Sequence, residues 1–151
     1  MASRRSWVRI PSAPPNTPMC RVAHAMRHFV QYHKAADMGT YKPPDSGFIV
    51  LTNKRSEPRQ GDRVSLVMGK GSPCRYSLCC SFVVDSVQRR ATGRFRKQVL
   101  GSTGKHFTPF IPLNDMSWLP DLKRECGNFG FGPHHIKNHA LINALEHAAL
   151  P

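Results

Sequence analysis

The chain has 151 residues, of which 40% are hydrophobic and 21% are charged. This length and composition fit one globular domain and exclude a wholly disordered chain. No window approaches the roughly 20 consecutive apolar residues that a transmembrane helix needs, and the first residues lack the apolar region of a secretory signal. We therefore expect a cytoplasmic protein that does not bind membranes.

The charge of the chain is strongly positive. Lys and Arg together number 22, against 9 Asp and Glu, so the formal net charge is +13. Such a protein attracts phosphate-rich partners, because its cations release the counterions condensed on a nucleic acid. We therefore expect DNA or RNA as the partner. The alternative is a basic soluble protein with no such partner.

The five cysteines do not suggest a disulfide framework or a zinc site, because their number is odd and no CxxC pair occurs. Cys79 and Cys80 are adjacent, and we expect neighbours in a strand to point to opposite faces. We interpret the cysteines as small apolar residues in a reducing compartment. We expect no metal and no cofactor.

The stretch WVRIP near the start can be encoded by UGG GUU CGA AUC CCN. These bases contain GGUUCGAAUCC, the common sequence of a transfer-RNA T arm, and counting onward in this register makes the codon of Pro15 the invariant CCA tail. We therefore hypothesise that residues 1–18 are a misassigned start, read through a bacterial transfer-RNA gene, with the true start at Met19 or Met26. We expect Trp7 to be extended and barely packed. The alternatives are a Pro-rich tail and an Arg-rich organelle presequence.

The remaining chain, 19–151, has no internal repeat and is expected to form a single domain. Apolar runs predict strands over 29–32, 47–54 and 63–68. A helical turn over 33–38 follows the first strand and ends at a glycine.

The longest strand signal covers 75–88. Alternation places one set of side chains on a single face: Tyr76, Leu78, Cys80, Phe82 and Val84. The other face carries Ser77, Cys79, Ser81, Val83 and Asp85. One or two more short strands are expected over 98–100 and 106–110.

The C-terminal part has helical signals. Ser117 predicts the N-cap of a helix over 117–126, with Pro120 in its first turn. A glycine-rich link over 128–135 then leads to an amphipathic helix over 136–150. Short strands followed by helices predict the α+β class, as a small, mostly antiparallel sheet or barrel with C-terminal helices.

Four stretches carry a more specific pattern: FVQYHKAADMG, FIVLTNK, PRQGDRVSLVMG and YSLCCSFVVDSV. They contain strands that end in polar or aromatic residues and a Gly-Asp turn that introduces a strand. Over 27–87 they resemble the PUA-like superfamily, in particular its EVE and ASCH-type members. The resemblance implies a small PUA-like β-barrel that binds RNA or modified bases.

The same resemblance implies a pocket that holds one flipped base. The candidate residues for this base pocket are Tyr32, His33, Thr52, Asn53 and Trp118. Tyr32 and Trp118 would provide a stacking surface, and Asn53 would offer both a hydrogen-bond donor and an acceptor. The alternative is structural: a strand end for the first four residues and a packing anchor for Trp118.

The densest positive stretch consists of Arg89, Arg90, Arg94, Arg96 and Lys97. These residues predict phosphate contacts beside the pocket, with Phe95 between them for stacking. The alternative is a solvated hairpin.

Catalysis is not indicated, because no nucleophile with a paired base and no HExxH motif occurs. The expected C-terminal helix would place His135, His139 and His147 on one side, and a spacing of four could bind a metal. A metal-dependent nuclease of restriction or defence type is therefore the alternative from another class. A non-catalytic adaptor module is the third.

Overall fold

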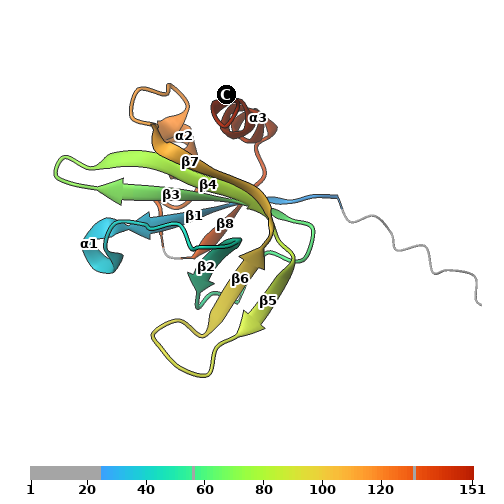
Figure 1. Cartoon of the computed structure of the whole chain (residues 1–151). Helices are drawn as coiled ribbons and strands as arrows, with labels where there is room; N and C mark the ends of the chain where they lie inside the picture. Colours follow the sequence, from blue (N-terminus) through green and yellow to red (C-terminus); the bar gives the residue numbers. More distant parts are fainter. Residues whose placement is uncertain (1–24, 56, 131) are drawn as a thin grey trace, which may run out of the picture.

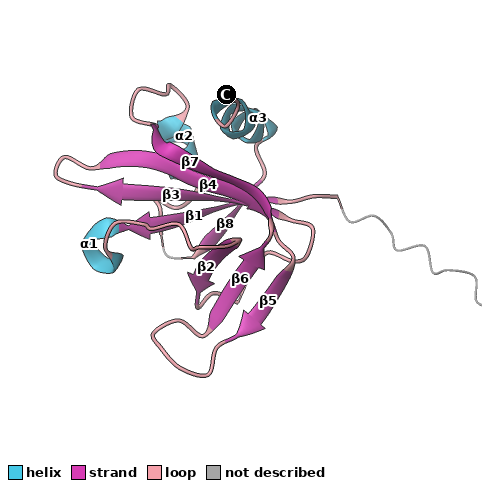
Figure 2. Ribbon diagram, in the orientation of Figure 1, coloured by secondary structure: helices cyan, strands magenta, loops and turns pink. Residues whose placement is uncertain are grey.

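The computed structural model of the protein describes residues 25–55, 57–130 and 132–151. The elements in chain order are β1 (His28–Lys34), α1 (Ala35–Met38), β2 (Phe48–Thr52), β3 (Arg63–Lys70), β4 (Arg75–Val83), β5 (Ser86–Arg89), β6 (Lys97–Gly101), β7 (Thr103–Pro112), α2 (Leu119–Glu125), β8 (Pro133–Ile136) and α3 (His139–Ala148). Strands dominate over helices (Figure 2), so the predicted α+β class is confirmed. The predictions for residues 1–18, for Trp7 and for the start codon lie outside the described residues.

The strands form two sheets. The larger sheet has five strands in the order β7-β4-β3-β1-β8, and the smaller has three in the order β2-β6-β5. Neighbouring strands are antiparallel except for β1 and β3, which are parallel. The smaller sheet lies on one side of the larger sheet, and α2 and α3 lie on the other (Figure 1). None of the described helices has the length and apolar character needed to cross a bilayer.

Each face of the five-stranded sheet is covered by its own apolar cluster. Phe29 and Leu66 belong to the cluster shared with the smaller sheet, whereas their neighbours Val30 and Val67 belong to the cluster under the helices. This division follows from the alternation of side chains along a strand. Because both faces are buried, β1 and β3 contain adjacent apolar residues instead of a strict apolar-polar alternation.

The strands do not form a closed barrel, so the predicted PUA-like barrel is not confirmed. Closure would require the edge strands of the two sheets to pair with each other, but no such pair occurs among the described strands. β1 pairs with β3 on one edge and with β8 on the other, and β2 pairs with β6. The result is a layered arrangement of two sheets with a gap between β1 and β2.

The long strand predicted over 75–88 is divided between the two sheets. β4 belongs to the larger sheet and β5 to the smaller, and the chain turns at Val84 and Asp85. At this corner the Val84 amide donates to the Asp62 carbonyl oxygen at 2.8 Å, and the Asp85 amide donates to the Leu100 carbonyl oxygen at 2.8 Å. Val84 lies in the core between the sheets. The apolar pattern of the sequence therefore continues through the corner and gives no sign that the strand ends there.

A β-bulge at Cys79 changes which side chains share a face. Leu66 pairs with Cys80 and the next residue, Val67, pairs with Leu78, so Cys79 is the extra residue of β4. Cys79 and Cys80 consequently lie in the same buried cluster, and the prediction that they face opposite ways was wrong. Burial raises the pKa of Cys79 to about 12 and that of Cys80 to about 11, so both remain protonated thiols at neutral pH.

The C-terminal helices begin later than predicted. α2 starts at Leu119 with Trp118 as its N-cap and with no side-chain capping bond, so the predicted Ser117 cap was wrong. α3 starts at His139, after the Asn138 side chain accepts a hydrogen bond from the Ala140 amide at 2.9 Å. Ile136, predicted to be helical, lies instead in β8, a short edge strand that begins in the predicted glycine-rich link. A strand of four residues that starts with proline has almost no sequence signal.

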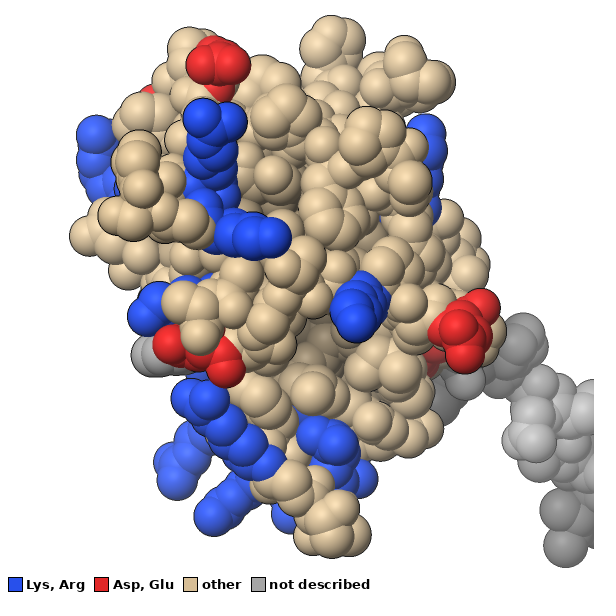
Figure 3. All heavy atoms as spheres, turned by 60° about the vertical axis from the view of Figure 1, so that its left-hand side comes forward, with Lys and Arg blue, Asp and Glu red and all other residues tan. Residues whose placement is uncertain are grey.

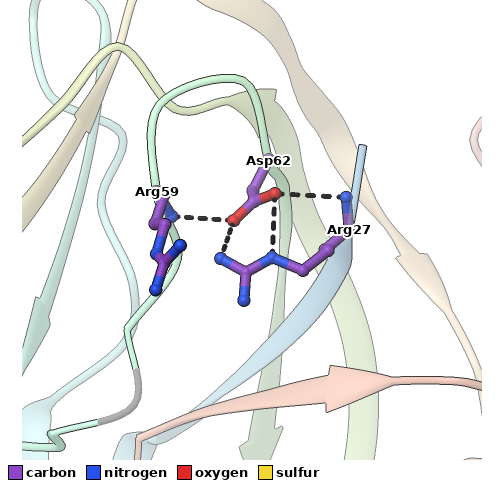
Figure 4. Close-up of polar contacts among 3 residues, drawn as sticks. All are labelled: Arg27, Arg59 and Asp62. Carbon is purple, nitrogen blue, oxygen red and sulfur yellow. Dashed lines mark hydrogen bonds and ion pairs between the residues drawn. The ribbon is translucent and has the colours of Figure 1, made fainter. Parts of the chain in front are cut away.

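The Gly-Asp turn before β3 is held by an ion pair. Asp62 is only 2% exposed. Its carboxylate accepts hydrogen bonds from the Arg27 amide and guanidinium and from the Arg59 amide (Figure 4). Burial raises the pKa of Asp62, but the hydrogen bonds from Arg27 and Arg59 and the Arg27 charge lower it further, so the net shift is downward. This contact attaches the chain just before β1 to the turn before β3.

Candidate functional site

A recess opens where β1 ends in α1, opposite the end of β2. Its walls come from β1 and α1, from the residues that follow β2, from the loop between β5 and β6, and from Phe129. The volume is about 340 Å³, at the lower end of the range for small-ligand sites. We call it the hairpin recess, after the β5–β6 hairpin that borders it.

Gln31 is the most unusual residue of the hairpin recess. It lies in the middle of β1 between Val30 and Tyr32, and it is only 7% exposed. Its Oε1 atom is buried and has no hydrogen-bond partner among the described residues. An unpaired buried acceptor is costly, about 1–3 kcal/mol, and native proteins contain few of them. The sequence analysis did not select Gln31, although a glutamine inside an apolar strand was a visible signal.

Tyr32 is held rigidly at the edge of the recess. Its ring stacks on Phe129 with centroids 5.0 Å apart and an angle of 14° between the planes. Burial and the neighbouring Cys74 thiol raise the pKa of the Tyr32 hydroxyl. The ring passes over Gly69, where a Cβ atom would overlap the hydroxyl group. One face of the ring is therefore occupied, and Tyr32 can offer a ligand only its edge or its other face.

Thr52 and Asn53 both line the hairpin recess, as the sequence predicted, but their polar groups already have partners within the chain. Thr52 is 1% exposed, and its Oγ1 accepts a hydrogen bond from the Lys54 amide at 3.1 Å. The Asn53 Nδ2 donates to the Arg94 carbonyl oxygen at 3.1 Å, and its Oδ1 accepts from the Arg96 amide at 2.7 Å. Asn53 thus fastens the β5–β6 loop to the end of β2.

The basic hairpin divides into two parts. Arg94 and Phe95 line the hairpin recess, with the Arg94 guanidinium 5.6 Å from the centre of the Phe95 ring. Lys97 is engaged at the base of the hairpin, where its Nζ lies 2.7 Å from Glu57 Oε2. Arg89, Arg90 and Arg96 lie on the hairpin outside the recess walls. Figure 3 shows basic side chains gathered at the lower end of the molecule, where Figure 1 places this hairpin.

Lys54 is a further cation that the sequence analysis did not select. Its side chain runs over Gly132, where a Cβ atom would lie 2.6 Å from Cγ and Cδ of the lysine. The Lys54 Nζ lies 3.3 Å from His134 Nε2. Burial lowers the pKa of His134, the hydrogen bond with the Gly130 carbonyl oxygen raises it, and the Lys54 charge lowers it further, so the net shift is downward. His134 is therefore neutral at pH 7, and Lys54 is a further basic residue in the recess wall.

His33 and Trp118, the other two predicted pocket residues, lie elsewhere. The His33 ring lines a second recess, where its Nε2 is 2.7 Å from the Gly39 carbonyl oxygen. Trp118 packs against the cluster between the larger sheet and the helices, and it lines neither recess. Of the five predicted pocket residues, the hairpin recess therefore brings together Tyr32, Thr52 and Asn53.

The three C-terminal histidines do not share a helix face. His135 lies in β8 and stacks on Phe29 at 5.2 Å, whereas His139 begins α3 and His147 lies in its last turn. The predicted arrangement on one helix was wrong, because the helix starts three residues later than expected. Within the described residues, no group of three or more His, Cys, Asp or Glu side chains is positioned to hold a metal ion.

Comparisons with protein-family models, with curated proteins and with solved structures find no match for this chain.

Proposed function

We propose that this protein binds a nucleic acid and receives one base in the hairpin recess. The observation that carries the proposal is the buried Gln31 amide, whose Oε1 has no partner among the described residues. A carboxamide presents a donor and an acceptor side by side, and the edge of a nucleobase presents the matching pair. A base that donates to Oε1 would remove the cost of the unpaired acceptor.

The surroundings of Gln31 suit a flat, partly apolar ligand. Tyr32, Phe95 and Phe129 supply aromatic surface around the amide, and Met38 and Leu51 supply aliphatic surface. Bases stack favourably on aromatic side chains, by about 1–3 kcal/mol per base. This combination of one amide with aromatic walls is typical of sites that read a flipped or unpaired base.

The charge around the recess suits the phosphates of such a ligand. Arg94 and Lys54 lie in its walls, and Arg89, Arg90 and Arg96 extend the positive surface along the hairpin. In the proposed mechanism these cations attract the backbone, and one base then enters the recess. The resemblance of 27–87 to the PUA-like superfamily implies the same class of function.

The decisive variant is Gln31→Met, which keeps the length of the side chain and removes the amide. We expect the affinity for a fluorescently labelled single-stranded oligonucleotide to fall about tenfold or more, the loss of a good base contact. We expect the melting temperature of the free protein to stay the same or rise, because the variant also removes an unpaired buried acceptor. If Gln31 has only a structural role, Gln31→Met should bind the oligonucleotide like the wild type and should melt at a lower temperature.

Gln88→Met is the matched control, because Gln88 lies on β5 and bonds only to Gln98 in the described chain. Equal affinity in Gln31→Met and the wild type would refute a role of Gln31 in base recognition. Panels of DNA and RNA oligonucleotides, with ordinary and modified bases at one position, would then identify the base that is read.

A further inference from the structure

The hairpin recess adjoins the second recess, which we call the loop recess after the segment that follows α1. Four residues line both recesses: Gln31, Tyr32, Met38 and Leu51. The hairpin recess lies along the end of β2 at Thr52 and Asn53, and the loop recess lies along its middle at Ile49 and Val50. Because β1 and β2 belong to different sheets and do not pair, one groove runs between them.

The loop recess is the larger of the two, with a volume of about 720 Å³. The rings of His33 and Tyr41 meet edge to face in its wall, 5.9 Å apart. Ile49 is 39% exposed and Met38 is 40% exposed, so the groove presents apolar surface to the solvent. Exposed apolar surface in a concave wall is typical of a site that a ligand covers.

Basic residues line both recesses: Lys42 in the loop recess, and Lys34, Lys54 and Arg94 in the hairpin recess, where Lys34 pairs with Asp37 at 3.3 Å. Apart from Gln31, the residues that line both recesses are aromatic or apolar. This order of charge and apolar surface matches a strand of nucleic acid, in which phosphates alternate with bases.

We propose that the groove holds two consecutive nucleotides of a single strand, with one base in each recess. The proposal rests on the proposed function and extends it, since it assigns the loop recess to the base next to the one near Gln31. In this arrangement two adjacent bases are unstacked and unpaired. The ligand is therefore a single strand or an opened loop.

The experiment compares three short ligands in competition with a labelled oligonucleotide bound to the full chain. They are a mononucleotide with phosphates at both ends, a dinucleotide with the same phosphates, and that dinucleotide with its second base removed. DNA and RNA versions are measured in parallel. The abasic dinucleotide is the essential control, because it keeps the added phosphate and removes only the added base.

We expect the dinucleotide to bind about tenfold more tightly than the abasic form, the gain from stacking one base. We expect Ile49→Ser to reduce that ratio towards one. Leu150→Ser is the control, because it makes a similar substitution at an exposed residue near the end of the chain, and it should keep the wild-type ratio. Equal affinities of the two dinucleotides, or a ratio that Ile49→Ser does not alter, would overturn the two-base groove and leave the proposed function standing. A failure of every ligand to compete, together with no binding of the labelled oligonucleotide, would overturn the proposed function itself.

Discussion

The side chain of Asn53 binds the backbone at Arg96: its Oδ1 accepts the Arg96 amide hydrogen at 2.7 Å. Its Nδ2 donates to the Arg94 carbonyl oxygen at 3.1 Å, so one carboxamide bonds to two backbone groups of the β5–β6 loop. The pattern of the sequence suggested that Asn53 reads a base directly. In the structure its hydrogen-bonding groups are occupied, and its role is to position Arg94 and Phe95 at the recess.

Asn53→Ala should therefore loosen the hairpin. We expect hydrogen exchange at the Arg96 amide to become about tenfold faster, the loss of a hydrogen bond worth about 1 kcal/mol. Gln98→Ala is the control, since it removes a side-chain bond of the same hairpin without changing the loop backbone. Exchange at Arg96 that is equally fast in the wild type and in Asn53→Ala would contradict this role.

Gly69→Ala should displace the Tyr32 ring. A Cβ at position 69 would lie 2.8 Å from Cε2 and Cζ of that ring and would overlap its hydroxyl group. We expect a loss of about 1–3 kcal/mol in the free energy of unfolding, as for other overpacked sites. The double variant Gly69→Ala/Tyr32→Phe lacks the clashing hydroxyl and should recover part of that loss in urea titrations. Lys70→Ala, the exposed neighbour, should show neither effect.

Asp62→Asn should lower stability most at neutral pH. The pKa of Asp62 is lowered in the folded protein, so its ionised form stabilises the fold above its unfolded pKa of about 4. That contribution is lost as the pH falls through the folded pKa. We expect a difference of about 1–3 kcal/mol from the wild type at pH 7, shrinking below pH ~4, in urea unfolding monitored by fluorescence. A constant difference across this range would refute the linkage, and Asp45→Asn, an exposed acid, serves as the control.

Arg94→Ala and Lys97→Ala should differ in their effect on salt dependence. Arg94 borders the recess, whereas Lys97 is already paired with Glu57 at 2.7 Å. We expect Arg94→Ala to reduce the slope of log K against log salt by about 1, the value for one lost phosphate contact. Lys97→Ala should change the slope less. Equal changes in slope would show that the ion pair with Glu57 opens on binding.

Trp118→Ala should destabilise the fold without weakening nucleic-acid binding. The Trp118 side chain packs against the cluster between the larger sheet and the helices and lines neither recess of the groove. We expect the free energy of unfolding to fall by about 1–3 kcal/mol, below the cost of a fully buried tryptophan. Binding measured well below the melting temperature should match that of the wild type. Weaker binding by the folded variant would contradict this prediction and would indicate that Trp118 contacts the ligand.

Local chemistry in the sequence predicted several parts of the fold correctly. The strand that becomes β1, the helical turn α1 and its end at Gly39 follow from apolar runs and a glycine. β2 and β3 were also predicted, because each is a compact apolar run between turn residues. Three of the five pocket candidates, Tyr32, Thr52 and Asn53, do line one recess. The strands and the helical turn depend on residues that are close together in the chain, whereas the recess joins residues from two sheets.

The remaining features depend on contacts between distant segments, and only the tertiary structure decided them. The bulge at Cys79 appears only when β4 is paired with β3, and it puts two adjacent cysteines in one core. The gap between β1 and β2 exists because β8, from the far end of the chain, occupies the edge of β1. The partners of Asn53 lie about 40 residues further along the chain. Composition and periodicity indicate which residues are buried. The tertiary arrangement of the strands decides which buried polar groups find a partner, and Gln31 Oε1 has none among the described residues.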